Sequence, residues 1–132
     1  GTNIFSVTSW VELAREGHEK SRQNLRHPEN PPEEAFATKQ LRKASGPYIA
    51  VSDFASDLQE QIRRFVPGDY TTLGADGFGF SDTRSAARRF FNIDAESIVV
   101  AALNALALEG KIDRSVAAEA ARRFNLTDPT KA

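Results

Sequence analysis

Apolar and polar residues follow each other along this chain of 132 residues in short blocks, some with helical spacing and some in strand-like runs. Runs rich in β-branched and aromatic residues predict strands, whereas apolar residues three or four positions apart predict helices. On this basis we predict strands at 4–7, 47–51 and 70–73. We predict helices at 9–25, 35–44, 56–66, 83–92, 95–109 and 114–124. Such alternation of strands and helices is typical of an α/β fold.

Helix ends are marked by residues that satisfy free backbone groups. Ser9 with Glu12 three residues later fits a capping box, and Thr8 is the alternative cap. Asp94 is the expected cap of the helix at 95–109, and Gly110 is its expected C′ residue. The other expected caps are Ser81 or Asp82 for the helix that ends near Asn92, and Asp113 or Ser115 for the last helix.

The spacing of apolar residues also predicts which helix faces are buried. The expected inward residues are Trp10, Leu13, Ala14, Phe36, Leu41, Leu58, Ile62, Phe65, Val66, Ile98, Val99, Ala102, Leu103 and Leu106, with Leu25 as a further candidate. The run 47–51 is nearly continuous in apolar character, which predicts a strand covered on both faces. The polar stretch 18–26 is expected to project into solvent. We expect one α/β domain over 1–126, followed by a flexible tail over 127–132.

A glycine-rich loop lies between the third predicted strand and the next helix. Its glycine order at 74–79 is G-x-x-G-x-G, the reverse of the dinucleotide-binding fingerprint, and Asp76 and Asp82 would repel phosphate. Phe78 and Phe80 are costly to leave in water, at ~1.5–3 kcal/mol each, which favours a buried loop or a subunit interface. The residues of this candidate interface loop are Asp76, Gly77, Phe78, Gly79, Phe80, Ser81, Asp82 and Arg84.

Other candidates for chemistry are weak. Four aspartates at 53, 57, 76 and 82 could pair for acid–base or metal chemistry, but three of the four lie at strand ends or helix starts, which favours a capping role. His18 and His27 lie in polar stretches without zinc-motif spacing, and a serine–histidine–aspartate triad has no nucleophile elbow. Arg-Arg-Phe recurs at 63–65, 88–90 and 122–124, either as helix-end cations with an anchoring ring or as an anion-binding arginine cluster. We therefore expect no catalytic, cofactor-binding or metal-binding residue.

Composition narrows the classes of protein further. Apolar residues are 40% and charged residues 27%, an ordinary globular composition, and the net charge of −1 argues against nucleic-acid binding. No apolar run approaches the ~20 residues of a membrane span. The chain has no cysteine, which suits a reducing cytoplasm, and no methionine, so we expect it to be a piece of a longer protein.

Four stretches resemble a known family. VTSWVEL at 7–13, IAVSD at 49–53, the segment from Gln61 to Arg84 and the segment from Arg88 to Asp113 are similar to the C-terminal domain of bacterial homodimeric pyruvate dehydrogenases. The amino-acid sequence of these stretches most resembles the actinobacterial type of this domain. The D-G-F-G-x-S-D segment at 76–82 also resembles the D-x-F-G-x-S-A-P segment of transketolases. The resemblance covers most of the chain and is weakest at the proline-rich connector 27–34.

The resemblance implies a three-layer αβα sandwich with a mostly parallel sheet, here without its first strand and helix. It implies that the longer enzyme decarboxylates pyruvate with thiamine diphosphate and magnesium, both held by other domains, and passes acetyl to lipoyl groups. The implied partners are the rest of the chain, a second identical subunit and the dihydrolipoyl acetyltransferase component. The implied role here is structural, at the dimer interface, and the chain is expected to be inactive alone. The alternatives are another 2-oxo acid dehydrogenase, a transketolase, or a free-standing interaction module.

Overall fold

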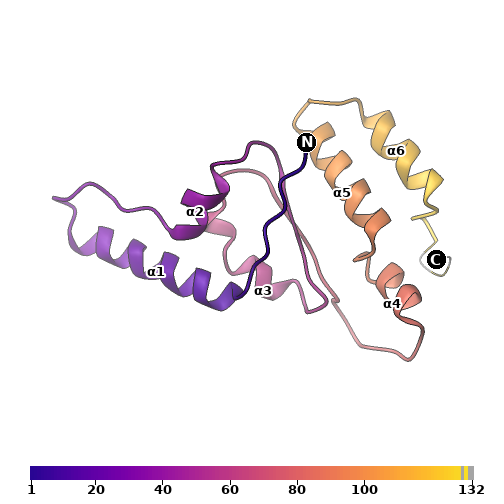
Figure 1. The fold of residues 1–132 in the computed structure, drawn as a ribbon, viewed down its shortest axis with the longest axis horizontal. Helices are drawn as coiled ribbons and strands as arrows, with labels where there is room; N and C mark the ends of the chain where they lie inside the picture. Colours follow the sequence, from indigo (N-terminus) through magenta and orange to yellow (C-terminus); the bar gives the residue numbers. More distant parts are fainter. Residues whose placement is uncertain (129, 131–132) are drawn as a thin grey trace.

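The structure is a computed structural model that describes residues 1–128 and residue 130. Its elements, labelled in Figure 1, are α1 (Trp10–Arg26), α2 (Phe36–Leu41), β1 (Tyr48–Val51), α3 (Asp57–Glu60), the 3₁₀ helix η1 (Arg63–Phe65), β2 (Tyr70–Leu73), α4 (Arg84–Phe90), α5 (Ala95–Leu108) and α6 (Arg114–Arg123). The predicted flexible tail falls partly on residues 129, 131 and 132, which lie outside the described residues.

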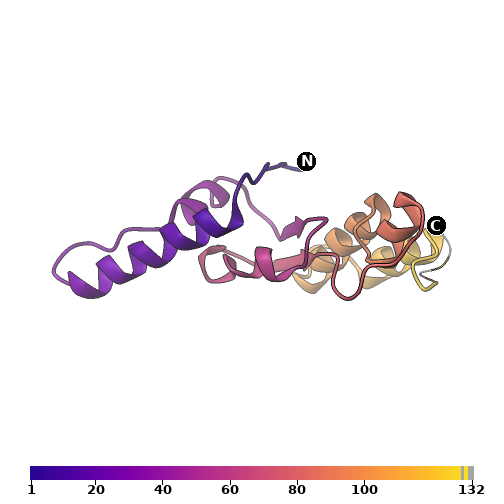
Figure 2. The same cartoon turned by 90° about the horizontal axis from the view of Figure 1, so that it is seen from below.

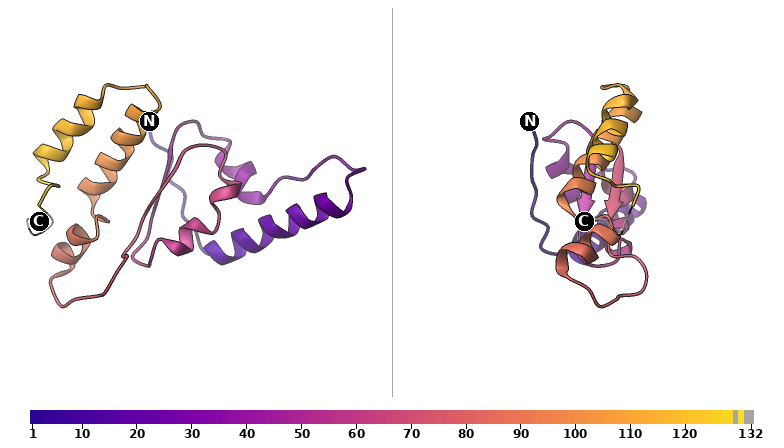
Figure 3. Two further views of the ribbon diagram at one scale, coloured as in Figure 1. Left: turned by 180° about the vertical axis from the view of Figure 1, so that it is seen from behind. Right: turned by 90° about the vertical axis from the view of Figure 1, so that its right-hand side faces the viewer.

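The elements form three layers arranged along the longest axis of the molecule. The strands lie in the middle, with α1, α2 and α3 on one side and α4, α5 and α6 on the other (Figures 1 and 3). β1 and β2 pair in parallel, from Tyr48 opposite Tyr70 to Val51 opposite Leu73. The predicted α/β fold is therefore confirmed. Because the sheet is only two strands wide, the molecule is a thin slab when seen from below (Figure 2).

Two strand predictions need correction. Residues 4–7 form no strand and are largely exposed, because within the described chain β1 and β2 pair only with each other. A β-prone run becomes a strand only where a neighbour supplies the ladder hydrogen bonds. The strand at 48–51 is also less covered than its apolar run suggested, since Ala50 is its only buried residue. A sheet of two strands leaves one edge of each strand open.

The core beside α1 is built around Phe65. Phe65 and Ile62 are buried against Ala14 of α1, and Trp10 and Leu13 pack at the margin of this cluster. α1 approaches so closely that a Cβ at position 17 would lie 2.6 Å from the ring of Phe65, which explains the glycine there. Among the expected inward residues, Phe36 (53%) and Leu25 (81%) are instead exposed, and Ala35 and Ala37 are buried beside α2.

The single helix predicted at 56–66 is wrong. It divides into α3 and η1, with Ile62 between them at φ −98° and ψ 1°. The carbonyl of Gln59 accepts a hydrogen bond from the hydroxyl of Tyr70 at 2.9 Å and another from the N–H of Ile62 at 3.3 Å. These bonds tighten the turn to i→i+3 geometry, so the α-helical ladder stops.

The structure confirms most of the predicted helix caps. Ser9 caps α1, Asp94 caps α5, and Asp113 caps α6. Gly110 ends α5 with φ +74°, the left-handed conformation expected at C′. The predicted cap of α4 is wrong, because Thr83 accepts the hydrogen bond from the N–H of Ala86 at 3.3 Å. Neither Ser81 nor Asp82 takes that place.

The stretch Arg84–Leu108 is long and apolar enough to cross a membrane by length and composition alone. It is nevertheless two helices, since Asn92 takes φ +57° between α4 and α5 and the charged residues Asp94 and Glu96 follow. Only 11% of the most apolar 18-residue stretch in this segment is buried. Val99, predicted to face inward, is 45% exposed. The layer therefore presents apolar surface, without the unbroken helix that a span needs.

Candidate functional site

The glycine-rich loop is fastened to the start of α3 at its root. A Cβ at Gly74 would lie 2.5 Å from the backbone nitrogen of Ser56, so only glycine permits this close approach. The N–H of Ala75 donates to the carbonyl of Phe54 at 2.9 Å. Both carboxylate oxygens of Asp76 accept hydrogen bonds from Ser56, one from its N–H and one from its hydroxyl, each at 2.7 Å. Asp76 therefore holds the loop in place and is not free for catalysis.

The two phenylalanines of the loop have different surroundings. Phe80 packs edge-on against Phe90 at a centroid distance of 4.8 Å and lies 5.8 Å from Phe91, so it anchors the loop to the end of α4. Phe78 is 97% exposed, beside Gly77 at φ +110°. Phe80 is still 44% exposed, so within the described chain the loop is not buried, and the alternative of a subunit interface stays a prediction. An exposed ring of this size at a loop tip is typical of an interface residue.

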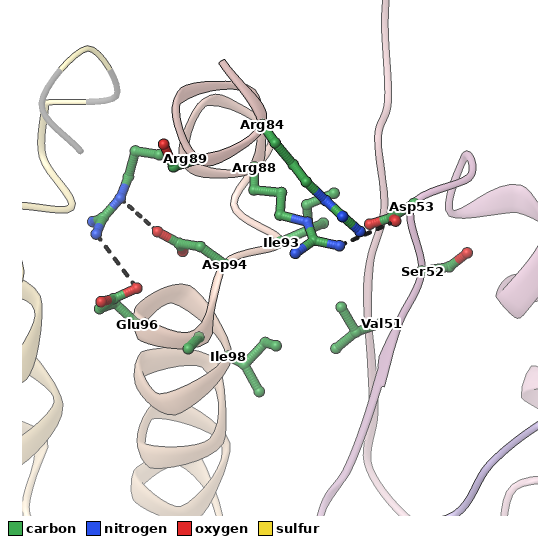
Figure 4. Close-up of a pocket in the computed structure, with 12 residues that line it drawn as sticks. Val51, Ser52, Asp53, Arg84, Arg88, Arg89, Ile93, Asp94, Glu96 and Ile98 are labelled. Carbon is green, nitrogen blue, oxygen red and sulfur yellow. Dashed lines mark hydrogen bonds and ion pairs between the residues drawn. The ribbon is translucent and has the colours of Figure 1, made fainter.

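Beyond the loop lies a groove of about 970 Å³ between the end of β1, α4 and the start of α5 (Figure 4). Its lining residues are Val51, Ser52, Asp53, Arg84, Ser85, Arg88, Arg89, Ile93, Asp94, Ala95, Glu96 and Ile98. A smaller hollow of about 220 Å³ adjoins it and shares Asp53, Arg84, Arg88 and Ile93. The groove thus has an apolar floor and charged walls at the carboxyl end of a parallel strand, where open α/β sheets commonly bind ligands.

Arg84 and Arg88 lie one turn apart on α4 and extend toward Asp53 (Figure 4). Arg88 forms an ion pair with Asp53 at 3.3 Å, and both side chains are partly exposed. Arg84 makes no hydrogen bond or ion pair with any described residue. One aspartate therefore faces two guanidinium groups, which leaves an excess of positive charge at this wall.

Arg89 points the other way and is buried. Its Nη1 donates to the carbonyl of Phe124 at 2.8 Å, at the end of α6. Its Nε lies 2.6 Å from a carboxylate oxygen of Asp94, in an ion pair not aligned as a hydrogen bond, and its Nη2 lies 3.6 Å from Glu96. Burial raises the pKa of Asp94, but bonds from Ser97 and the charge of Arg89 outweigh burial and lower it overall. Arg89 thus joins α4, α5 and α6.

The sequence-predicted candidates for chemistry do not converge. Asp53 and Asp76 have the partners given above, and Asp82 accepts a bond from the N–H of the next residue at 2.7 Å. His18 packs edge-on against Phe65, and His27 lies 3.2 Å from Glu29. In the part of the chain that the structure describes, no three carboxylate or imidazole side chains come together as a metal site would require. The described residues therefore include no cluster of these side chains that is suited to hold a magnesium ion.

The first two occurrences of the Arg-Arg-Phe pattern have different surroundings in the structure. The ring anchors its element at 63–65, where Phe65 is 7% exposed, whereas Phe90 is 48% exposed and the buried member is Arg89. Sequence reasoning missed the role of Arg89 and the groove beside it. The only signal available was two adjacent arginines followed closely by an aspartate, and nothing local distinguishes the buried arginine from its exposed neighbour.

Comparison with known proteins gives consistent matches. The model of the transketolase-like TK C-terminal domain matches residues 1–94. The chain is 69% identical over 97% of its length to the pyruvate dehydrogenase E1 component of Corynebacterium glutamicum and 56% identical over 96% to that of Mycobacterium tuberculosis. It is 42% identical over 96% to that of Escherichia coli strain K12. The chain spans about 14% of the length of each of these relatives. It belongs to the family of transketolase-like C-terminal domains.

Proposed function

We propose that this chain is the structural, dimer-forming domain of a pyruvate dehydrogenase E1 component. The observation that supports this most is the 69% identity, over 97% of the chain, to a protein of that name. In this proposal the full-length enzyme decarboxylates pyruvate with thiamine diphosphate and magnesium, held by other parts of the polypeptide. It then transfers the acetyl group to lipoyl groups of a dihydrolipoyl acetyltransferase, in the cytoplasm.

The proposed contribution of this chain is an interface centred on Phe78. Its ring is 97% exposed, while Phe80 and Asp76 hold the loop on both sides of it. Such a ring presents a large apolar area at little further entropic cost, because the loop is already held. Burying a phenylalanine against a partner contributes ~1.5–3 kcal/mol. A second identical subunit is the proposed partner.

The test replaces Phe78 by serine in the full-length enzyme, with Leu25→Ser as the control. Leu25 is 81% exposed at the far end of α1, so both substitutions remove an exposed apolar side chain. We expect F78S to raise the dimer dissociation constant about 10- to 100-fold, from the lost burial. Analytical ultracentrifugation would measure the dimer dissociation constant. Steady-state kinetics would measure the KM for pyruvate, which should change much less.

The outcomes separate the two parts of the proposal. Equal dimer stability in F78S and L25S would refute the interface centred on Phe78. A full-length wild-type protein that releases no carbon dioxide from pyruvate with thiamine diphosphate and magnesium present would refute the proposed activity. The exposed position of Phe78 also means that its loss should leave the thermal stability of the domain itself nearly unchanged.

A further inference from the structure

The arginines of the groove differ sharply in how their charge is balanced. Arg89 has two carboxylates and a backbone carbonyl as partners. Arg84 and Arg88 share one partly exposed aspartate, which only Arg88 contacts, at 3.3 Å. Their side chains start one helical turn apart, at about 5–6 Å between Cβ atoms, where like charges repel. An anion placed between them would relieve this repulsion and use N–H groups that have no acceptor.

The rest of the groove suits a small ligand. Its volume of about 970 Å³ is at the upper end of the range for small-molecule sites, and Val51, Ile93 and Ile98 provide an apolar floor. Ser52 lies on the β1 side of the groove, but its hydroxyl accepts the N–H of Phe54 at 3.0 Å and points away from the arginines (Figure 4), so the arginines are the main donors. The N-terminus of α5 offers fewer free N–H donors to a ligand, because Asp94 already accepts the N–H of Ser97.

The number of donors favours a phosphate over a carboxylate. One guanidinium fork engages both oxygens of a carboxylate, whereas a phosphate monoester presents a third terminal oxygen for a second guanidinium. Two guanidinium groups approaching from one helix can each take a pair of acceptors on such a group. Asp53, on the opposite wall, would stay paired with Arg88 and limit the site to ligands with one anionic group.

We propose that this groove binds a small phosphate monoester, with the phosphate between Arg84 and Arg88 and an apolar body over Val51, Ile93 and Ile98. The proposal goes beyond the pyruvate activity and does not depend on it. It concerns α4 and the carboxyl end of β1, and it requires neither the loop tip nor a second subunit.

The experiment uses the full-length protein with thiamine diphosphate and magnesium saturating, so that phosphate probes cannot report on a cofactor site. Arginines are modified with phenylglyoxal, and each position is quantified by peptide mass spectrometry. The probes are phenyl phosphate, inorganic phosphate, benzoate as the carboxylate comparison, and chloride at equal ionic strength. Arg114 and Arg123, exposed on α6, are the internal controls. With phenyl phosphate at about ten times its Kd, we expect modification of Arg84 and Arg88 to slow about tenfold, with no change at the controls.

A second measurement uses calorimetric titration of phenyl phosphate into the R84Q/R88Q and R114Q/R123Q variants. We expect the first pair to lose about tenfold or more in affinity and the second pair to bind as the wild type does. The proposal is overturned if benzoate protects as well as phenyl phosphate, if all four arginines are protected equally, or if R84Q/R88Q binds unchanged. It is also overturned if Arg84 and Arg88 do not react in the absence of phosphate, because the rest of the protein would then cover the groove.

Discussion

Replacing Arg89 by methionine should loosen the whole α4–α5–α6 layer. Methionine keeps a similar length and apolar stem but removes the guanidinium, which leaves Asp94 and the carbonyl of Phe124 without their partner. Removing one partner of a fully buried ion pair costs about 3–5 kcal/mol. The Asp94 side chain retains 15% of its exposure, so water can replace part of the lost interaction. We therefore expect a loss of about 2–3 kcal/mol.

Hydrogen exchange in the full-length protein measures this loss where it occurs. Backbone amides of α6 and of the start of α5 should exchange about 30- to 150-fold faster in R89M, since each 1.4 kcal/mol corresponds to a factor of ten. The matched control is R88M, the same substitution at the preceding residue. Arg88 has a single ion pair, with Asp53, which is partly exposed and long, at 3.3 Å. That pair should contribute less than about 1 kcal/mol.

The double variant R89M/D94N tests the cause. Asparagine keeps the helix cap but carries no charge, so it should recover part of the protection lost in R89M if an unpaired carboxylate is responsible. Equal exchange in R89M and R88M would refute the assigned role of Arg89. No recovery in the double variant would show that lost packing, and not the unpaired charge, dominates.

Three further results are expected from backbone crowding and from acid. G74A should lower stability by about 1–3 kcal/mol, because its Cβ would lie 2.5 Å from the nitrogen of Ser56, whereas G79A, with nothing within 4 Å, should be nearly neutral. Equal melting temperatures would contradict this. Hydrogen bonds from Arg63 lower the pKa of Glu60 to about 2. The stabilisation of the folded protein by this carboxylate is therefore fully present above pH 4.5 and is lost as the pH falls toward 2. Because this side chain is 36% exposed, we expect about 1 kcal/mol, seen as a gap between wild type and E60Q at pH 7 that closes near pH 2.

Local signals in the sequence were sufficient for the fold class and for most helix ends. Ser9, Asp94 and Asp113 cap their helices as predicted, because a cap needs only a side-chain oxygen and an N–H two or three residues away. Gly110 likewise meets a purely local requirement for positive φ. The parallel pairing of β1 and β2 agrees with the alternation of strands and helices. The resemblance in the glycine-rich loop likewise agreed with the family found by comparison.

Contacts between distant parts of the chain decided the rest. The break at Ile62 depends on the hydroxyl of Tyr70, which arrives from β2 and takes the carbonyl that an unbroken helix would use. The difference between Arg88 and Arg89 depends on partners 35 residues away, Asp53 on one side and Phe124 on the other. Adjacent arginines look alike in sequence because local patterns extend over only three or four residues. Which of them is buried, and which lines a groove, is decided only when Asp53, just after β1, and Phe124, at the end of α6, come within reach of α4.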